Sequence, residues 1–150
     1  MKKIAIPVVL VLALIASALV GCAKTTSTVS GDAILTTICA GNLDFDDLGI
    51  YGEEACLNPI KYWCFSGLRC GSESLPHTIF LRNESESITI DSIKVADTFE
   101  HGGVTMQYEH HSLLPGEVAG VQLTIHVDRK CPPGEYPFAI VFHATGYEAK

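Results

Sequence analysis

The strongest constraint on the fold is a strict alternation of apolar and polar side chains near residue 120. Val121, Leu123, Ile125 and Val127 alternate with Gln122, Thr124, His126 and Asp128. Because successive side chains of a β-strand point to opposite faces of a sheet, this pattern predicts a strand with one dry and one wetted face. No segment from residue 75 onward has the helical period of about 3.6 residues. We therefore expect an all-β fold.

Four other strands are predicted in the same half of the chain. The five predicted strands are residues 77–83, 87–95, 104–111, 119–128 and 136–145. Sequences rich in Pro, Gly, Asn and Ser separate them, at residues 83–86, 101–103, 115–116 and 132–134. Such residues favour turns, and short strands broken by turns about every ten residues are typical of an antiparallel sandwich.

Two of these strands support more specific predictions. In the last strand, Phe138, Ile140 and Phe142 should face the core, and we expect this strand to form a hairpin with the preceding one through residues 129–135. In residues 87–95 the apolar side chains change parity at Asp91-Ser92, which predicts a β-bulge or a bend there.

Two turn sequences suggest a family. Leu113-Leu114-Pro115-Gly116-Glu117 precedes the alternating strand, and Pro132-Pro133-Gly134-Glu135-Tyr136 precedes the last strand. The pattern resembles bacterial immunoglobulin-like domains, which often have a Pro-Gly-Glu turn before one strand and a Pro-Gly-x-Tyr turn before the final strand. The resemblance covers about the C-terminal half and implies an immunoglobulin-like antiparallel β-sandwich. It implies no particular activity, because such sandwiches have many functions.

The N-terminal half should complete the domain and add a loop. Residues 75–150 are too few for a whole immunoglobulin-like domain of roughly 100 residues, so we expect a further strand at the β-favouring residues 32–39. Residues 40–74 would then be a cysteine-containing insertion after the first strand. Loops of that length in compact domains are often functional, so we expect a distinctive binding surface there.

The insertion contains a candidate metal site. Asp44, Asp46 and Asp47 resemble part of a calcium-binding loop. No Glu stands at the twelfth position from Asp44, where an EF-hand has its bidentate ligand, so a solvated acidic loop is the alternative. The histidines of the second half (His110, His111, His126 and His143) fall on different strands or faces, and we expect no single metal site from them.

Five cysteines are candidates for disulfide bonds. They are Cys39, Cys56, Cys64, Cys70 and Cys131. In an oxidising compartment they would form two disulfides and leave one thiol, with Cys64 and Cys70 the easiest local pair. A zinc site is the alternative, but the chain has no Cys-x-x-Cys pair, which is the usual spacing for zinc and for thioredoxin-like redox sites.

The first residues resemble a bacterial lipoprotein signal. Lys2 and Lys3 precede an apolar run over residues 4–20, and Leu19-Val20-Gly21-Cys22 resembles the lipobox. The resemblance implies that residues 1–21 are removed and that Cys22 becomes diacylated. The alternative is an uncleaved membrane helix, since the run is close to the minimum of about 17 residues. The polar residues 22–31 should then be a flexible tether for a domain at residues 32–150.

Charge and motifs narrow the function. The formal net charge of −7 disfavours nucleic acid as a partner. No Gly-x-Ser-x-Gly or Gly-x-x-x-x-Gly-Lys motif is present, so we expect no catalysis and no cofactor. The expected function is a binding module for a protein or glycan, lipid-anchored in the cell membrane or the outer membrane and facing the extracytoplasmic side. The alternatives are a small-molecule or metal-binding envelope protein that uses the acidic insertion, and an envelope assembly or stress accessory factor.

Overall fold

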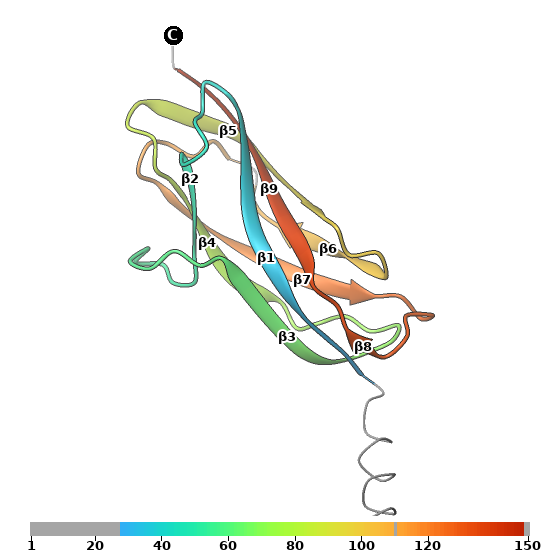
Figure 1. Ribbon diagram of the computed structural model, residues 1–150. Coiled ribbons are helices and arrows are strands. Elements are labelled where there is room, and N and C mark those ends of the chain that lie inside the picture. The colour runs from blue at the N-terminus through green and yellow to red at the C-terminus, as the bar shows by residue number, and fades with distance from the viewer. Residues whose placement is uncertain (1–27, 110, 149–150) are drawn as a thin grey trace, which may run out of the picture.

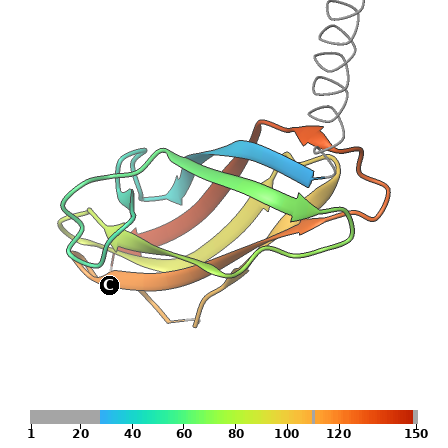
Figure 2. The same ribbon diagram turned by 90° about the horizontal axis from the view of Figure 1, so that it is seen from below.

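The computed structural model describes residues 28–109 and 111–148, and this part of the chain is all-β (Figure 1). Two sheets pack face to face, as in a β-sandwich, and Figure 2 shows the two layers from one end. The strands are β1 (Thr28–Gly41), β2 (Leu48–Tyr51), β3 (Tyr62–Arg69), β4 (His77–Asn83), β5 (Ile88–Asp97), β6 (Gly102–Gln107), β7 (Val118–Val127), β8 (Gly134–Glu135) and β9 (Phe138–Glu148). Within the described residues, no helix is long and apolar enough to cross a membrane.

The strand order differs between the two sheets. The first sheet has the order β3-β1-β9-β5, with β8 also pairing with β1, and the second has the order β2-β4-β7-β6. β1 is antiparallel to β3 but parallel to both β8 and β9. The expectation of a purely antiparallel sandwich is therefore corrected, because the first strand of the chain lies beside the last one and runs in the same direction.

The apolar faces predicted from alternation form the core. Val121, Leu123 and Ile125 of β7 are fully buried, and so are Ile140 and Phe142 of β9. These rows face each other across the space between the sheets, where they join one continuous apolar cluster. Because this burial removes apolar surface from water, it is the main stabilising contribution in a fold of this kind.

The bend predicted in the second strand of the C-terminal half is confirmed. The register between β5 and β9 shifts between Ile90 and Ser92. The extra residue lets Ile90 and Ile93 both face the core, although they have opposite parity in the sequence.

The predicted hairpin of the last two long strands is wrong. β9 pairs with β1 and β5, whereas β7 pairs with β4 and β6 in the other sheet. Residues 128–137 therefore cross from one sheet to the other. The alternation in each strand indicated correctly which side is buried, but both buried sides face each other across the core instead of lying side by side in one sheet.

Residues 40–74, expected to be a loop insertion, contribute a strand to each sheet. β2 buries Leu48 and Ile50 as an edge strand of the second sheet, and β3 buries Trp63 and Phe65 as an edge strand of the first. The segment is part of the sandwich because its apolar side chains alternate in short runs that the two sheet edges can accept.

The first strand also begins earlier than expected. β1 starts at Thr28, and Val29 is fully buried, so residues 28–31 belong to the sheet and not to the predicted tether. Cys22 and the rest of the predicted signal and tether lie outside the described residues. The pairing of β1 with β9 runs as far as Gly41 and Gly146, near the end of β9. The end of the sandwich that carries Thr28 is therefore opposite the end near the C-terminus (Figure 1).

Candidate functional site

A groove separates the two sheets along one edge of the sandwich, and we call it the β1–β2 groove. Its volume is about 430 Å³, and the middle of β1, the strand β2 and residues 59–62 line it. The groove forms because β3 follows β1 only as far as Ile34, where it pairs with Tyr62. One more backbone bond joins the two segments, from the Leu35 amide to the Lys61 carbonyl at 2.8 Å. Beyond it the chain pairs with β2 instead, with the amide of Ile60 donating to the carbonyl of Ile50 at 2.9 Å.

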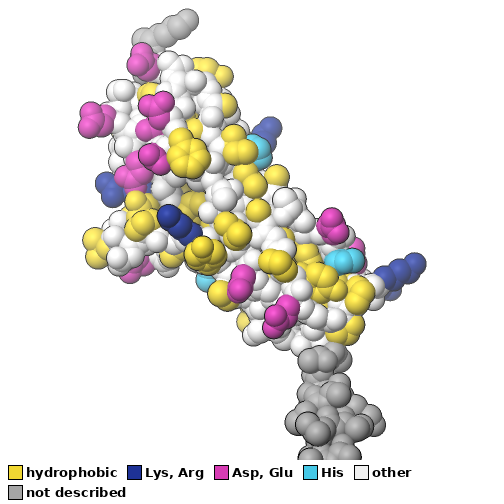
Figure 3. Space-filling view, in the orientation of Figure 1, with side chains coloured by type: hydrophobic (Ala, Val, Ile, Leu, Met, Phe, Trp, Pro, Cys, Tyr) yellow, Lys and Arg dark blue, Asp and Glu magenta, His cyan; other side chains and the backbone are white. Residues whose placement is uncertain are grey.

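Large apolar side chains lie in the open beside this groove. Ile34 is 45% exposed, its cross-strand neighbour Tyr62 is 63% exposed, and Phe45 is 74% exposed. All three line the groove. Figure 3 shows hydrophobic side chains along this face of the molecule. Neighbouring exposed apolar residues around a hollow are a feature of surfaces that bind a partner.

Acidic groups form part of the rim. Asp46 and Glu84 line the groove, together with one cation, Lys61. The Tyr51 hydroxyl donates to the Glu84 carboxylate, and this bond, followed by burial, raises the pKa of Tyr51 to about 12. A phenol with that pKa stays protonated at neutral pH, so it serves as a hydrogen-bond donor and not as a base.

The predicted calcium residues form a hydrogen-bonded turn. The Asp47 carboxylate accepts from the Asp44 amide at 2.6 Å, and the Asp47 amide donates to the Asp44 carbonyl at 3.1 Å. One carboxylate is thus engaged by the backbone of its own turn, while Asp46 faces the groove. Over residues 28–109 and 111–148 no group of three or more His, Cys, Asp or Glu side chains is placed to hold a metal ion.

The five described cysteines are free thiols in this structure. Cys64 lies exposed on the outer face of β3, where a hydrogen bond to Asp32 raises its pKa. The sulfur of Cys70 instead lies 2.7 Å from the carbonyl oxygen of Cys131. Cys70 therefore contacts Cys131, whereas the sequence spacing made Cys64 its easiest partner.

The histidines are dispersed. His126 on β7 lies 3.4 Å from the carboxylate of Glu73, whereas His143 is exposed on β9 in the other sheet. His110 lies outside the described residues. His111 belongs to a second hollow, described next.

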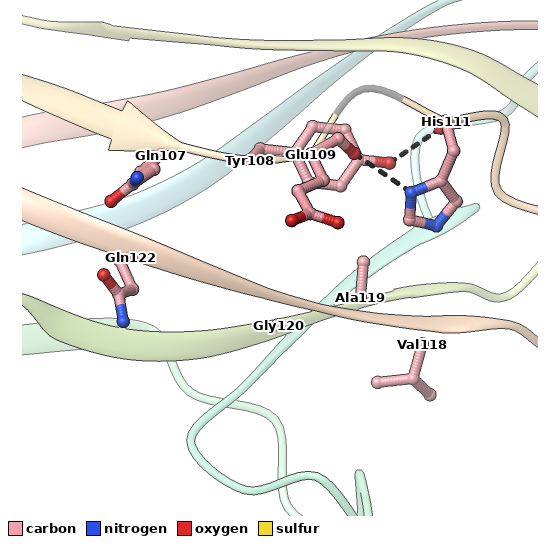
Figure 4. A pocket seen from close by; sticks show the side chains of 8 residues that line it. All are labelled: Gln107, Tyr108, Glu109, His111, Val118, Ala119, Gly120 and Gln122. Carbon is pink, nitrogen blue, oxygen red and sulfur yellow. Dashed lines mark hydrogen bonds between the residues drawn. The ribbon is translucent and has the colours of Figure 1, made fainter.

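The second hollow lies over β6, β7 and the residues that follow β6, and its volume is about 420 Å³ (Figure 4). Tyr108 donates to the carbonyl of His111 at 2.9 Å, and a ring nitrogen of His111 lies 3.0 Å from the carbonyl of Glu109. These bonds close a local turn. The polar groups shown there hold the loop in shape and do not form a nucleophile beside a base, so we regard the β1–β2 groove as the stronger candidate site.

Sequence reasoning looked for a binding surface in residues 40–74, and the candidate groove is lined by this segment and also by β1. Ile34 and Leu35 are adjacent, so one of them must face outward in any strand. Ile38 lies an even number of residues from Ile34, so it shares the face of Ile34 and not that of Leu35. A strand that is apolar on both faces is a signal for a covered or binding outer face, and it was available from the sequence.

No protein-family model matches the chain, and no curated protein matches it in sequence. A functional assignment therefore depends on the residues and on the geometry described above.

Proposed function

We propose that this chain is a lipid-anchored, non-catalytic binding module that holds an extended apolar segment of a partner protein in the β1–β2 groove. The observation that carries the proposal is the set of large apolar side chains, Ile34, Phe45 and Tyr62, exposed around one groove. Burying such side chains against a partner would remove them from water, at about 25 cal/mol per Å² of apolar surface before the costs of association.

The chemistry of the rim favours a particular kind of segment. Asp46 and Glu84 line the groove, and Asp44 and Asp47 lie in the turn beside it. A segment with apolar side chains flanked by Lys or Arg would match both the apolar floor and this acidic rim. The immunoglobulin-like resemblance of the turns before β7 and β9 supports the same class of function, because such sandwiches commonly bind partners through loops and edges.

The lipid anchor would give the groove a defined place. With a diacylated Cys22, Thr28 would lie at most about 20 Å of extended chain from the membrane surface. The end of the sandwich with Thr28 would then face the membrane, and the groove would lie farther along β1. Two acyl chains are sufficient for stable attachment.

Anchoring is tested by the mass of the full chain isolated from membranes. Globomycin treatment or Cys22→Ser should retain the leader, and Cys22→Ser should also remove the mass of the diacylglycerol. A mass that both treatments left unchanged would refute the lipoprotein assignment.

Binding is tested by crosslinking the full chain in its native membrane and identifying the captured protein. The double variant Phe45→Ser with Tyr62→Ser should reduce capture about tenfold or more, as expected for loss of a cluster of binding anchors. The matched control is Leu75→Ser with Tyr147→Ser, which removes side chains that are 87% and 53% exposed elsewhere. Equal capture by both double variants would contradict the groove assignment, and groove-dependent retention on a glycan array without protein capture would identify a glycan partner instead.

A further inference from the structure

Two connections cross between the sheets at the end of the sandwich that carries Thr28. Residues 70–76 lead from β3 in the first sheet to β4 in the second, and residues 128–133 lead from β7 back toward β8 and β9. These crossings lie side by side. The amide of Gly71 donates to the carbonyls of Val127 and Asp128 at 2.9 and 3.2 Å, and the amide of Val127 donates to the carbonyl of Ser72 at 2.9 Å.

Each crossing contains one cysteine, and the two meet. Cys70 is the first residue of one crossing, and its sulfur lies 2.7 Å from the carbonyl oxygen of Cys131 in the other. The amides of Gly71 and Cys131 donate to the same acceptor, the carbonyl of Asp128, at 3.2 and 3.1 Å. Cys131 is buried and Cys70 is partly buried, and both pack on the same apolar core. A disulfide requires adjacent backbones whose side chains can reach each other. The contact of the Cys70 sulfur with the Cys131 backbone, and the packing of both side chains on one core, favour this pair.

We propose that Cys70 and Cys131 form a disulfide bond that joins the two inter-sheet crossings at the membrane-facing end of the sandwich. The pairing depends only on the fold. The presence of an oxidant in the cell depends on the extracytoplasmic placement proposed above, so the two proposals can fail separately.

The reaction is a thiol–disulfide exchange with a small-molecule or protein disulfide as oxidant. The more accessible Cys70, as its thiolate, attacks one sulfur of the oxidant, forms a mixed disulfide and releases the first thiol. The Cys131 sulfur then attacks the Cys70 sulfur and releases the second thiol, and the protons of the two cysteines pass to the two leaving thiolates. The protein is oxidised by two electrons, and one oxidant disulfide is reduced to two thiols.

Exposure sets the order of attack. Cys131 is 3% exposed, and burial, which has the largest effect, raises the pKa of its thiol. A buried thiol with a raised pKa is a poor first nucleophile for an external disulfide, but it is well placed for the second, intramolecular attack.

The other described cysteines contact other segments. The Cys39 thiol lies 3.9 Å from the Phe45 carbonyl beside β1, and the amide of Cys56 donates to the Glu53 carbonyl at 3.1 Å within its own turn. Cys64 points away from the core on β3. We therefore expect these three to remain thiols when Cys70 and Cys131 pair.

The test is a disulfide map of the full chain in detergent. The reduced protein is incubated in a glutathione redox buffer, quenched with acid, alkylated and digested without reductant. The peptides with Cys70 and Cys131 should be joined in the wild type and in the control variant Cys64→Ser. The joined peptide should disappear in Cys70→Ser and Cys131→Ser. Circular dichroism should show that the serine variants are folded, so that loss of the joined peptide is not caused by unfolding.

The wild-type map decides the outcome even if the serine variants do not fold. Complete alkylation of both Cys70 and Cys131 after oxidation would overturn the proposal, and so would a peptide that joins Cys70 to Cys64. Protein alkylated directly in living cells gives a separate measurement. A bond that forms in glutathione buffer but is absent from cells would support the pairing and contradict the extracytoplasmic placement.

Discussion

Replacing Asn83 by alanine should destabilise the protein substantially, because this side chain connects three segments of the sandwich. Asn83 ends β4 and is fully buried. Its amide nitrogen donates to the carbonyls of Ile88 and Leu113, both at 2.8 Å, and its side-chain oxygen accepts from the amide of Ser85 at 3.0 Å. It therefore ties the end of a strand in one sheet to the start of β5 in the other sheet and to the segment that leads into β7.

The size of the effect follows from the groups that alanine would leave behind. The two carbonyls keep a second partner each, since Ile88 also accepts from the Ser85 hydroxyl and Leu113 from the amide of Ile90. The Ser85 amide, on a residue that is 8% exposed, would lose the side-chain oxygen that accepts its hydrogen bond. Three lost hydrogen bonds at about 0.5–1.5 kcal/mol each, with one buried donor unsatisfied, predict a loss of about 2–4 kcal/mol. That is a large share of the roughly 5–15 kcal/mol that stabilises a typical domain.

Urea unfolding measures this loss. Trp63 is the single tryptophan and is buried against His77, with ring centroids 4.7 Å apart, so its fluorescence should report unfolding. The matched control is Asn58→Ala, which removes an exposed side chain and should change the free energy of unfolding by less than about 0.5 kcal/mol. If Asn83→Ala lay within about 1 kcal/mol of this control at equal urea dependence, the reasoning would be wrong.

Asn83→Asp separates hydrogen bonding from packing, because the new side chain has nearly the same shape. The oxygen that replaces the amide nitrogen would face two carbonyls, so burial and these acceptors should raise the pKa of the new acid in the folded state. A raised folded-state pKa means that stability is retained below the unfolded pKa and lost as pH rises. The difference in stability between wild type and Asn83→Asp should therefore grow from pH ~4 to pH ~7.

Three further predictions concern single side chains. Burial lowers the pKa of His77 from 6.5, so its contribution to stability should be complete above that pH and lost as pH falls below it, and urea unfolding of His77→Phe should show less of this dependence. Phenolate absorbance should show one tyrosine that ionises near pH 12, and Glu84→Gln should lower that value toward the ordinary 10, since the hydrogen bond from Tyr51 to this carboxylate is the largest cause of the shift. Gly102→Ala should lower the melting temperature because the added carbon would overlap a backbone carbonyl of β7, whereas Gly103→Ala meets nothing closer than 3.8 Å and should melt like the wild type.

The positions and faces of the C-terminal strands could be predicted from the sequence. Residues 77–83 are β4 without change, and the alternation at Val121, Leu123 and Ile125 identified the buried side of β7. The change of parity at Asp91-Ser92 also located the bulge in β5. These features are local, because a strand's period of two and the residues of a turn depend on neighbours a few positions away.

The pairing of strands was not predictable in the same way. β1 lies parallel to β9, more than a hundred residues later, and β7 lies in a different sheet from β9. A buried row of apolar side chains on each of two strands does not show how the strands are arranged. The two strands could be neighbours in one sheet, or they could lie in different sheets and face each other across the core. Which arrangement forms depends on how all strands fill the space between the sheets together.

For the candidate sites, too, local features could be predicted from the sequence and long-range contacts could not. The sequence by itself identified the acidic turn, the cysteines and the apolar strands, because these follow from residue type and short-range spacing. Only the tertiary structure placed Tyr62 beside Ile34 at the rim of a groove and Cys70 against Cys131. Those contacts join segments that are distant along the chain. They exist because the two sheets must cover each other's apolar faces, and because the connections between the sheets cross at the ends of the sandwich.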